Sequence, residues 1–161
     1  MDEQLLSRQV PQSLEAEQAV LGSILIDSRC VADVIGILKP EDFHLQQNRD
    51  IYETIYTMFN FSQTIDPVTV LDKMRELGVY QDNSRDYVLQ LMEITPTAAN
   101  VQRYANIVRE KSMLRGLGTA ASEISQMVGE QVGLTGYLVQ SSTTLPDIPE
   151  IMASKPFWNS V

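Results

Sequence analysis

The sequence has one cysteine, one histidine and no long apolar run. A lone cysteine, Cys30, excludes an internal disulfide framework and indicates a reducing compartment. No stretch approaches the roughly 20 apolar residues that a transmembrane helix requires. The first residues also lack the basic start and apolar stretch of a secretory signal. These absences predict a cytoplasmic protein that does not contact a membrane.

Residues that could carry catalysis or hold a metal are also scarce. No phosphate loop of the form G-x-x-x-x-G-K-[ST] occurs in the sequence, so it offers no basis for ATP hydrolysis by this chain. The only histidine, His44, has no neighbouring cysteine, which argues against a zinc site and favours a surface or capping role. We therefore expect no catalytic residue, metal or cofactor in this chain.

Positive charge is in short supply, with 12 Lys and Arg against 21 Asp and Glu and a net charge of -9. Nucleic-acid binding depends largely on cations that neutralise phosphates, so a domain that holds DNA by itself is disfavoured. The group of residues that comes nearest to a basic cluster includes the acidic residue Glu110. It also lacks the aromatic side chains on which nucleic-acid bases stack. The members of that cluster are Arg103, Arg109, Lys111 and Arg115. A protein partner is the better prediction, with DNA contacted only indirectly.

Apolar residues recur at helical spacing along most of the 161 residues, and 43% of them are hydrophobic. This length and composition suit one domain with its own core. The pattern predicts an all-α fold of about six helices, the first two forming a helical hairpin. The expected helices cover about 13–26, 28–39, 48–60, 66–78, 84–94 and 97–128.

The first helix has a clear N-terminal signal, because Ser13 can cap it. Glu15 and Glu17 then lie in the first turn, where carboxylates favour the positive end of the helix dipole. Two residues at i and i+2 point to different sides of a helix, so this pair indicates a local structural role and not catalysis. The positions expected on the buried side are Leu14, Val20, Leu21, Ile24 and Leu25.

The third and fourth helices have contrasting signals. The third is rich in apolar and aromatic residues and should be central, with the hydroxyls of Tyr52 and Tyr56 reaching its wet edge. The fourth has start and stop signals at its two ends. Asp66 can cap it, Pro67 suits its first position and Gly78 ends it.

The sixth expected helix is the longest and carries an apolar seam. Ile107, Leu114 and Ala121 follow at seven-residue steps, with Leu117 and Ile124 between them. Such a seam requires a partner helix. We expect the part before Lys111 to pack on its own domain and the later part to meet another helix or another chain.

Glycine and proline alter the pattern near the end of the chain. Gly116 and Gly118 each cost about 1 kcal/mol in a helix, which predicts a bend or a frayed section. No helical period survives after Gly129, and a tail with partial order is expected. In it, residues 137–139 could pair as a strand and Phe157-Trp158 could dock on an apolar surface.

Five segments in the same order resemble the N-terminal domain of bacterial replicative DNA helicases, the DnaB family, from residue 11 to about 115. They are Pro11–Leu25, Asp42-Phe43, Ile51-Tyr52, Ile65-Asp66 with Val70-Leu71, and Thr95–Lys111. Asn48 stands where the family often has a histidine, at a helix start that Asn can still cap. The positions that carry the family pattern are Pro11, Glu15, Glu17, Leu21, Gly22, Phe43, Tyr52, Asp66, Pro96, Asn100 and Tyr104.

The resemblance implies an all-helical collar and not a motor. In the family, this region is followed by a helical hairpin, a linker and a RecA-like ATPase domain that uses ATP and Mg. The collar pairs with its neighbours into a hexameric ring around single-stranded DNA and helps to engage primase and the loader. The long helix would run into the first hairpin arm. After Gly129, neither the acidic second arm nor a linker is found, which leaves open a truncated, frame-shifted or stand-alone product.

We therefore expect an oligomerisation and partner-docking module that forms a dimer or hexamer and binds full-length helicase, primase or loader. Two alternatives stay open: a stand-alone relative that modulates a helicase ring or primase, and a single-stranded DNA-binding module. The expected organisation is a flexible arm at 1–10, the domain at 11–115, the first hairpin arm at 116–128 and a divergent tail at 129–161. The interface candidates are Ile107, Arg109, Lys111, Leu114, Leu117, Ala121 and Ile124.

Overall fold

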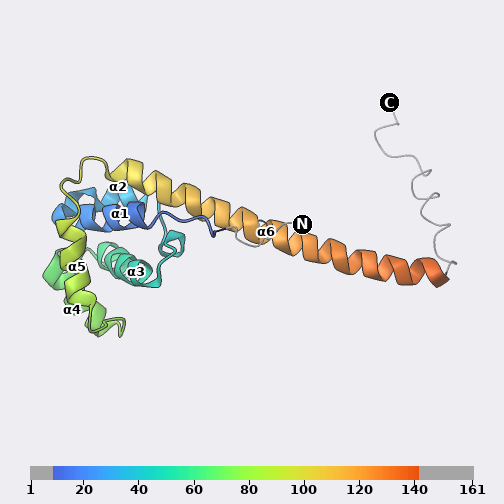
Figure 1. The fold of residues 1–161 in the computed structure, drawn as a ribbon. Coiled ribbons are helices and arrows are strands. Elements are labelled where there is room, and N and C mark those ends of the chain that lie inside the picture. The colour runs from blue at the N-terminus through green and yellow to red at the C-terminus, as the bar shows by residue number, and fades with distance from the viewer. Residues whose placement is uncertain (1–8, 142–161) are drawn as a thin grey trace, which may run out of the picture. The chain divides into compact units, whose positions relative to one another are not determined.

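The computed structural model describes the backbone of residues 9–141 and the side chains of residues 9–131. Within this part the chain forms six α-helices and two 3-10 turns, without a strand, which confirms the all-α prediction (Figure 1). The α-helices are α1 (Leu14–Ile26), α2 (Val31–Ile35), α3 (Gln46–Asn60), α4 (Pro67–Glu76), α5 (Ser84–Glu93) and α6 (Val101–Ser141), and the 3-10 turns are Ser28–Cys30 and Pro40–Asp42. The chain divides into two compact units, Met1–Gly116 and Leu117–Val161.

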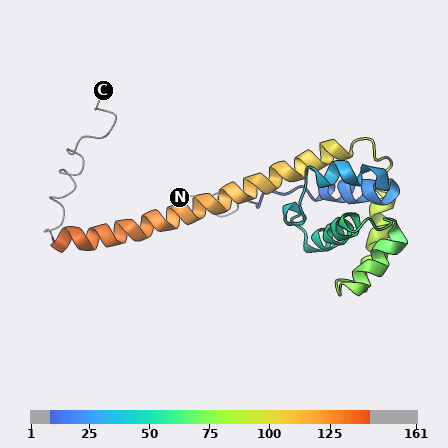
Figure 2. The same ribbon diagram turned by 180° about the vertical axis from the view of Figure 1, so that it is seen from behind.

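The first unit has a single hydrophobic core. Helix α1 packs against α3 and α5, and α3 packs against α4 (Figures 1 and 2). The first part of α6 completes the core with one buried side chain in each of its first turns. The core residues of α1, α3 and α6 are Ala16, Val20, Leu21, Ile24, Leu25, Ile51, Tyr52, Ile55, Met58, Val101, Ala105 and Val108.

Helix α1 begins as predicted, because the Ser13 hydroxyl accepts a hydrogen bond from the Ala16 N–H at 3.4 Å. Leu21 and Leu25 are buried as expected. The prediction was wrong for Leu14, which is 43% exposed. Leu14 is the first residue of the helix, and the buried residues of α1 begin only at Ala16.

The second predicted helix is wrong in extent. A 3-10 turn, Ser28–Cys30, precedes α2, which has only five residues and ends at Ile35 with Gly36 as its C-cap. The Asp27 carboxylate accepts the Arg29 N–H at 3.1 Å and so favours a turn at this point. Farther on, Lys39 is extended because it precedes Pro40, which prevents the helix from continuing.

Helix α3 is central, as predicted, but begins at Gln46 and not at Asn48. The expectation that its tyrosine hydroxyls reach water was wrong for Tyr52. That side chain is fully buried, and its hydroxyl donates to the Leu38 carbonyl at 2.9 Å. Its ring packs against Phe43 at 4.6 Å between centroids. Burial raises the pKa of the Tyr52 hydroxyl.

Helix α4 confirms the predicted start and stop. Asp66 Oδ1 accepts from the N–H groups of Val68 and Thr69, both at 2.9 Å. Thr69 returns a bond by accepting the Asp66 N–H at 3.0 Å, which completes a capping box. Pro67 occupies the first helical position. Gly78, with φ +75°, ends the helix in the left-handed conformation that glycine tolerates.

Helix α6 is continuous through Gly116 and Gly118, so the frayed section predicted there was wrong. The helix also extends past Val128 to Ser141, and the strand suggested at 137–139 is helical instead. Neighbouring alanines are strong helix formers and offset the cost of the glycines. The expectation for Phe157-Trp158 lies outside the described residues, as does most of the predicted N-terminal arm.

Candidate functional site

A buried carboxylate on α1 holds the start of α3. Glu17 is 2% exposed, and its Oε1 accepts the His44 N–H at 2.7 Å. Its Oε2 accepts the Leu45 N–H at 3.3 Å and the Asn48 Nδ2 at 2.9 Å. The first N–H groups of a helix lack partners in the helix itself, so Glu17 caps α3 from a different helix. The role is structural, but the prediction that it is local to α1 was wrong.

Asn48 extends this contact into a bridge among three helices. Its Oδ1 accepts the hydroxyl of Tyr87, on α5, at 2.6 Å. The Tyr87 oxygen in turn accepts from Gln18 Nε2, on α1, at 3.3 Å. Burial raises the pKa of Tyr87, which keeps its proton available for this bond. Asn48 is therefore a buried connector and not the helix cap that the sequence suggested.

A second buried carboxylate, Asp42, ties the same loop to α6. Its Oδ2 accepts the Lys39 N–H at 2.7 Å. Its Oδ1 accepts from Arg109 Nη1 at 3.0 Å and from the Ser112 hydroxyl at 2.6 Å. Arg115 Nη2 adds a bond to the Asp42 carbonyl. The segment 39–45 is thus held on one side by α1 and on the other by α6.

These bonds account for two members of the predicted basic cluster. Arg109 pairs with a carboxylate of its own unit, and Arg115 Nη1 donates to the Pro11 carbonyl at 2.8 Å. Cations that are engaged within the chain have less to offer to phosphates. Arg109 is therefore engaged inside the first unit, while its place on a protein interface stays a prediction.

Gly22 allows α1 and α5 to approach closely. A Cβ atom at this position would lie 2.0 Å from Thr95 Oγ1 and 2.4 Å from the Leu91 carbonyl oxygen. Both distances are far below van der Waals contact. The Thr95 hydroxyl is itself fixed by a bond of 2.8 Å to that carbonyl. A structural requirement thus explains the glycine among the family positions.

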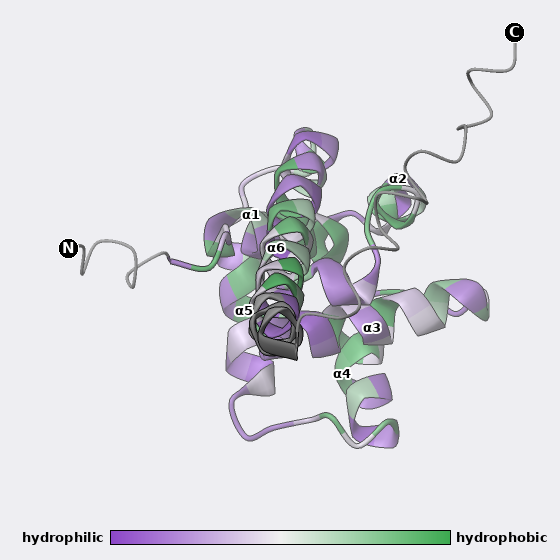
Figure 3. Ribbon diagram, turned by 90° about the vertical axis from the view of Figure 1, so that its right-hand side faces the viewer, coloured by the Kyte–Doolittle hydropathy of each residue, from purple (hydrophilic) through white to green (hydrophobic). Residues whose placement is uncertain are grey.

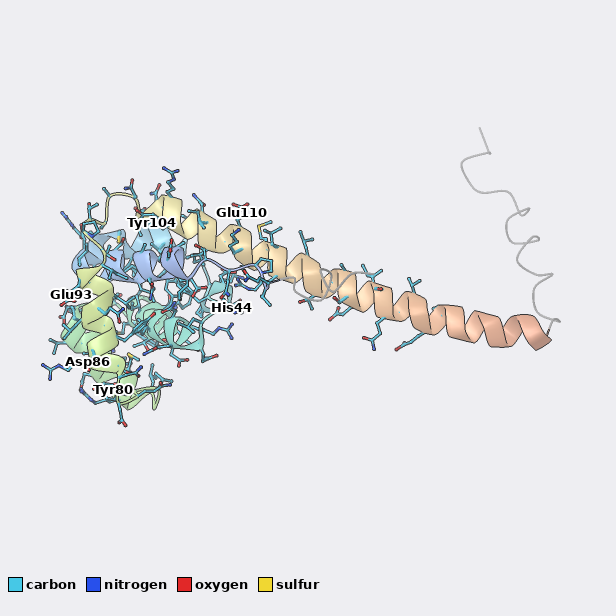
Figure 4. The ribbon with its side chains drawn as sticks, in the orientation of Figure 1. His44, Tyr80, Asp86, Glu93, Tyr104 and Glu110 are labelled. Atoms are coloured by element: carbon cyan, nitrogen blue, oxygen red, sulfur yellow. The ribbon has the colours of Figure 1, made fainter. Side chains whose placement is uncertain are left out.

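The other positions that carry the family pattern are divided between the core and the surface. Leu21, Phe43 and Tyr52 are buried, and Tyr104 is half-buried against the core at the first part of α6 (Figure 4). Glu15 is exposed and lines a hollow of about 200 Å³ beside the end of α5. Pro96 and Asn100 are exposed and lie in the segment between α5 and α6. The structure therefore does not assemble them into one site.

An exposed apolar row runs along the second unit. We define the α6 seam as Leu117, Ala121, Ile124 and Val128, which are spaced four, three and four residues apart. Leu117 is 65% exposed and Ile124 is 61% exposed. Hydrophobic and hydrophilic residues alternate along the ribbon of α6 (Figure 3). Their spacing places the seam residues on one side of the helix.

Two other interface candidates lie in the first unit. Leu114, which is 41% exposed, precedes Ala121 by seven residues. Ile107 is partly buried and packs against the core of its own unit, as predicted for the part of the helix before Lys111. The exposed apolar surface that remains for a partner is therefore concentrated in the later part of the helix.

A possible metal cluster and a free thiol are the remaining features to consider in the described part of the chain. Its residues contain no group of three or more His, Cys, Asp or Glu side chains that could hold a metal ion. The Cys30 thiol donates to the Asp27 carbonyl at 3.0 Å, and burial raises its pKa to about 11. A thiol with such a pKa is a poor nucleophile. Among the described helices, none is long and apolar enough to span a membrane.

Comparisons with known proteins agree with this arrangement. The chain is 36% identical over 121 residues to the replicative DNA helicase DnaB of Leifsonia xyli, with 74% of this chain and 26% of that protein covered. It is 37% identical over 132 residues to DnaB of Geobacillus stearothermophilus, with 78% of this chain and 28% of that protein covered. The chain thus spans about a quarter of the length of these relatives.

Solved structures show the same fold. The N-terminal domain of DnaB helicase from Mycobacterium tuberculosis matches with a TM-score of 0.70 and 36% identity, over 73% of this chain and 86% of that one. The corresponding domain from Helicobacter pylori, which was studied with its interactions with primase, matches with a TM-score of 0.62 and 20% identity, over 80% of this chain and 99% of that one. The family model described as "DnaB-like helicase N terminal domain" matches residues 9–110, and the chain belongs to this family.

Proposed function

We propose that this chain is the collar of a replicative DNA helicase, which joins subunits through α6 and docks partner proteins without catalysing a reaction itself. The observation that carries the proposal is the exposed α6 seam. Leucine and isoleucine side chains at a/d spacing favour burial against another helix. ATP and Mg would act in the ATPase part of a full-length helicase, in the cytoplasm.

The size of the seam supports self-association of moderate strength. It runs from Leu117 to Val128, 11 steps along the helix or about 16 Å at 1.5 Å per residue. Full burial of one leucine or isoleucine contributes about 1.5 to 3 kcal/mol. Two copies of the seam would bury several such side chains, enough to offset association costs and hold a dimer in roughly the micromolar range. Such dimers are the units from which a hexameric collar would be built.

A partner-docking role has independent support from the first unit. Its fold matches the Helicobacter pylori domain whose interactions with primase were studied. Its carboxylates outnumber its cations, so a protein partner suits it better than DNA does. Primase, or a helicase loader, is therefore the partner that we propose alongside a second copy of the chain.

Solution mass tests the seam directly. Light scattering of the full chain over a concentration series should show dimers or hexamers near micromolar concentrations. Leu117→Asp and Ile124→Asp should shift the mass to the monomer, because a carboxylate cannot be buried in an apolar seam without a large cost. Gln126→Asp is the matched control, since Gln126 is exposed and its spacing places it on the opposite side of the same helix, so that this variant should leave the mass unchanged.

A parent chain that stays monomeric at every concentration would contradict the proposal. Seam variants that associate as strongly as the Gln126→Asp control would contradict it as well. In that case the association would have to come from a different surface.

A further inference from the structure

The methionine side chains that the structure describes fall into two groups by exposure. Met58 and Met74 belong to the core and are 2% and 1% exposed, and Met92, on α5, packs against the core. Met113 is 56% exposed and Met127 is 62% exposed, and both lie on α6. Among these methionines, the thioether groups that are most open to solvent are therefore on one helix.

Both exposed methionines lie one helical turn from a large residue of the α6 seam. Met113 precedes Leu117 by four residues, and Met127 follows Ile124 by three. Residues three or four apart are neighbours on the surface of a helix. Met113 and Met127 are 14 residues apart, or about four turns, so they lie on the same side of α6. Their thioethers therefore border the apolar surface that the proposed self-association would bury.

Packing within the described residues does not account for these two side chains. Met58 and Met74 fill gaps in the core, as methionine commonly does, whereas Met113 and Met127 are neither in the core nor packed against it. Methionine is also frequent on surfaces that meet partners, because its side chain is flexible and polarisable. The same exposure opens the sulfur atoms to oxidants while the seam is free.

A hydroperoxide oxidises an exposed thioether in a two-electron step. The sulfur lone pair attacks one oxygen of hydrogen peroxide, the O–O bond breaks and an S–O bond forms. The departing hydroxide takes the proton of the transferred oxygen and leaves as water. The product is methionine sulfoxide, in which a polar S=O group replaces the apolar sulfur. Because the reaction requires access to sulfur, Met113 and Met127 should react before Met58 and Met74.

We propose that Met113 and Met127 are reversible oxidation sites through which a hydroperoxide weakens the self-association of α6. The proposal rests on the proposed function, because it requires the seam to be buried against a second copy. The seam consists of leucine, alanine, isoleucine and valine, whose side chains donate no hydrogen bond. A sulfoxide oxygen buried against them loses its water without a replacement, which disfavours association.

Reduction reverses the change. Methionine sulfoxide reductases, one for each epimer, return the sulfoxide to the thioether. Two electrons come from a dithiol of the reductase, and the oxygen leaves with two protons as water. The seam is then apolar along its border again, and the second copy can return.

Light scattering of the full chain before and after treatment with hydrogen peroxide tests the proposal. Intact mass spectrometry counts the added oxygen atoms, peptide mapping locates them, and circular dichroism checks that the helices persist. The dissociation constant for self-association should rise at least about ten-fold on oxidation, as expected for burying an unpaired polar group. Treatment with reductases for both epimers should return it to its starting value.

Substitutions assign the effect to the two sites. The double variant Met113→Leu/Met127→Leu keeps apolar side chains of similar volume, so it should associate like the parent and should not respond to peroxide. It retains Cys30, Met1 and Met152, so an effect of oxidation at those residues would persist in it.

Two further variants complete the set. Met92→Leu is the matched control and should lose association on oxidation as the parent does. Met113→Gln/Met127→Gln places a polar amide at both positions and should weaken association without peroxide.

The inference is overturned if the chain with sulfoxide at both positions associates like the untreated parent, or if the double leucine variant is as sensitive to peroxide as the parent. It is also overturned if peroxide modifies Met1 and Met152 but leaves Met113 and Met127 as thioethers, or if reduction does not restore association. A parent that is monomeric before oxidation contradicts the α6 seam itself, and the inference falls with it. A parent that associates equally before and after oxidation contradicts the oxidation sites alone.

Discussion

Glu17, on α1, accepts the backbone N–H of Leu45, the N-cap residue of α3, at 3.3 Å and so caps a helix that begins far along the chain. A buried carboxylate with three donors around it is stabilising only while all three bonds are made. This contact links the family pattern in α1 to the position of α3.

We expect Glu17→Gln to lower the free energy of unfolding by about 1.5 to 3 kcal/mol, the usual worth of hydrogen bonds to a charged group. The amide removes the charge and places an N–H₂ group against other donors. Urea unfolding followed by circular dichroism measures the change. Glu15→Gln is the control, because Glu15 is exposed and makes none of these bonds. Equal stability of the two variants would refute a capping role for Glu17.

Gly22→Ala should destabilise the chain by about 1 to 3 kcal/mol or more, because the new methyl group would overlap Thr95 and force α1 and α5 apart. Gly116→Ala provides the opposite case, since a Cβ there meets no atom within 4 Å. It should stabilise the helix by up to about 1 kcal/mol. Thermal unfolding of both variants checks the signs. A neutral Gly22→Ala would mean that the two helices can separate at little cost.

Asp42→Ala should release the first part of α6 from the loop at 39–45. Arg109 and Ser112 lose their hydrogen-bond acceptor. The free energy of unfolding should fall by about 1.5 to 3 kcal/mol. The lower end of this range is expected, because the Arg109 side chain is 46% exposed and water screens its charge. Hydrogen exchange should become faster for the amides of 109–115 before those of α3. Arg29→Ala, which breaks an ion pair whose arginine side chain is 90% exposed, is the control and should leave exchange unchanged. Uniform acceleration throughout the first unit would argue against a local tie.

Alkaline pH should reveal the buried hydroxyl of Tyr52. Its pKa in the folded chain is raised above the ordinary value of 10.0, so the unfolded chain ionises first as the pH rises. The stability that this group contributes is complete below pH 10 and is lost as the pH rises toward the folded pKa. Burial also raises the pKa of Tyr87, so its contribution to stability is lost in the same direction as the pH rises.

Tyr52→Phe tests this dependence. At pH 7 it should cost about 1 to 3 kcal/mol, because the buried Leu38 carbonyl loses its donor. Between pH 9 and 11, roughly around the ordinary tyrosine pKa, its stability should fall less steeply than that of the parent. Urea unfolding at each pH gives both quantities. Parallel pH profiles for the two chains would show that Tyr52 ionises equally in both states.

Local signals in the sequence were sufficient for much of the fold. The cap at Asp66, the stop at Gly78 and the apolar period of α3 depend on neighbours within a few residues, and all three predictions were confirmed. The spacing of the α6 seam was likewise readable, because residues on one side of a helix follow from its period alone. The long second helix was wrong, since a 3-10 turn occupies its predicted start and α2 ends at Ile35, earlier than the apolar pattern indicated.

Contacts between distant residues could not be read from the sequence. Glu17 caps α3 and Asp42 holds Arg109 only because the chain brings together groups that lie 28 and 67 residues apart. The local sequence pattern does not show which distant residues meet in the fold. It also does not distinguish a buried aspartate or glutamate from a solvated one. The sequence by itself determined α1, α3, α4, α5 and the first part of α6 and which sides of them are apolar, because helix period and end signals are local. Only the tertiary structure decided which polar groups are buried together and which apolar ones remain exposed, because desolvation depends on every element that packs around a group.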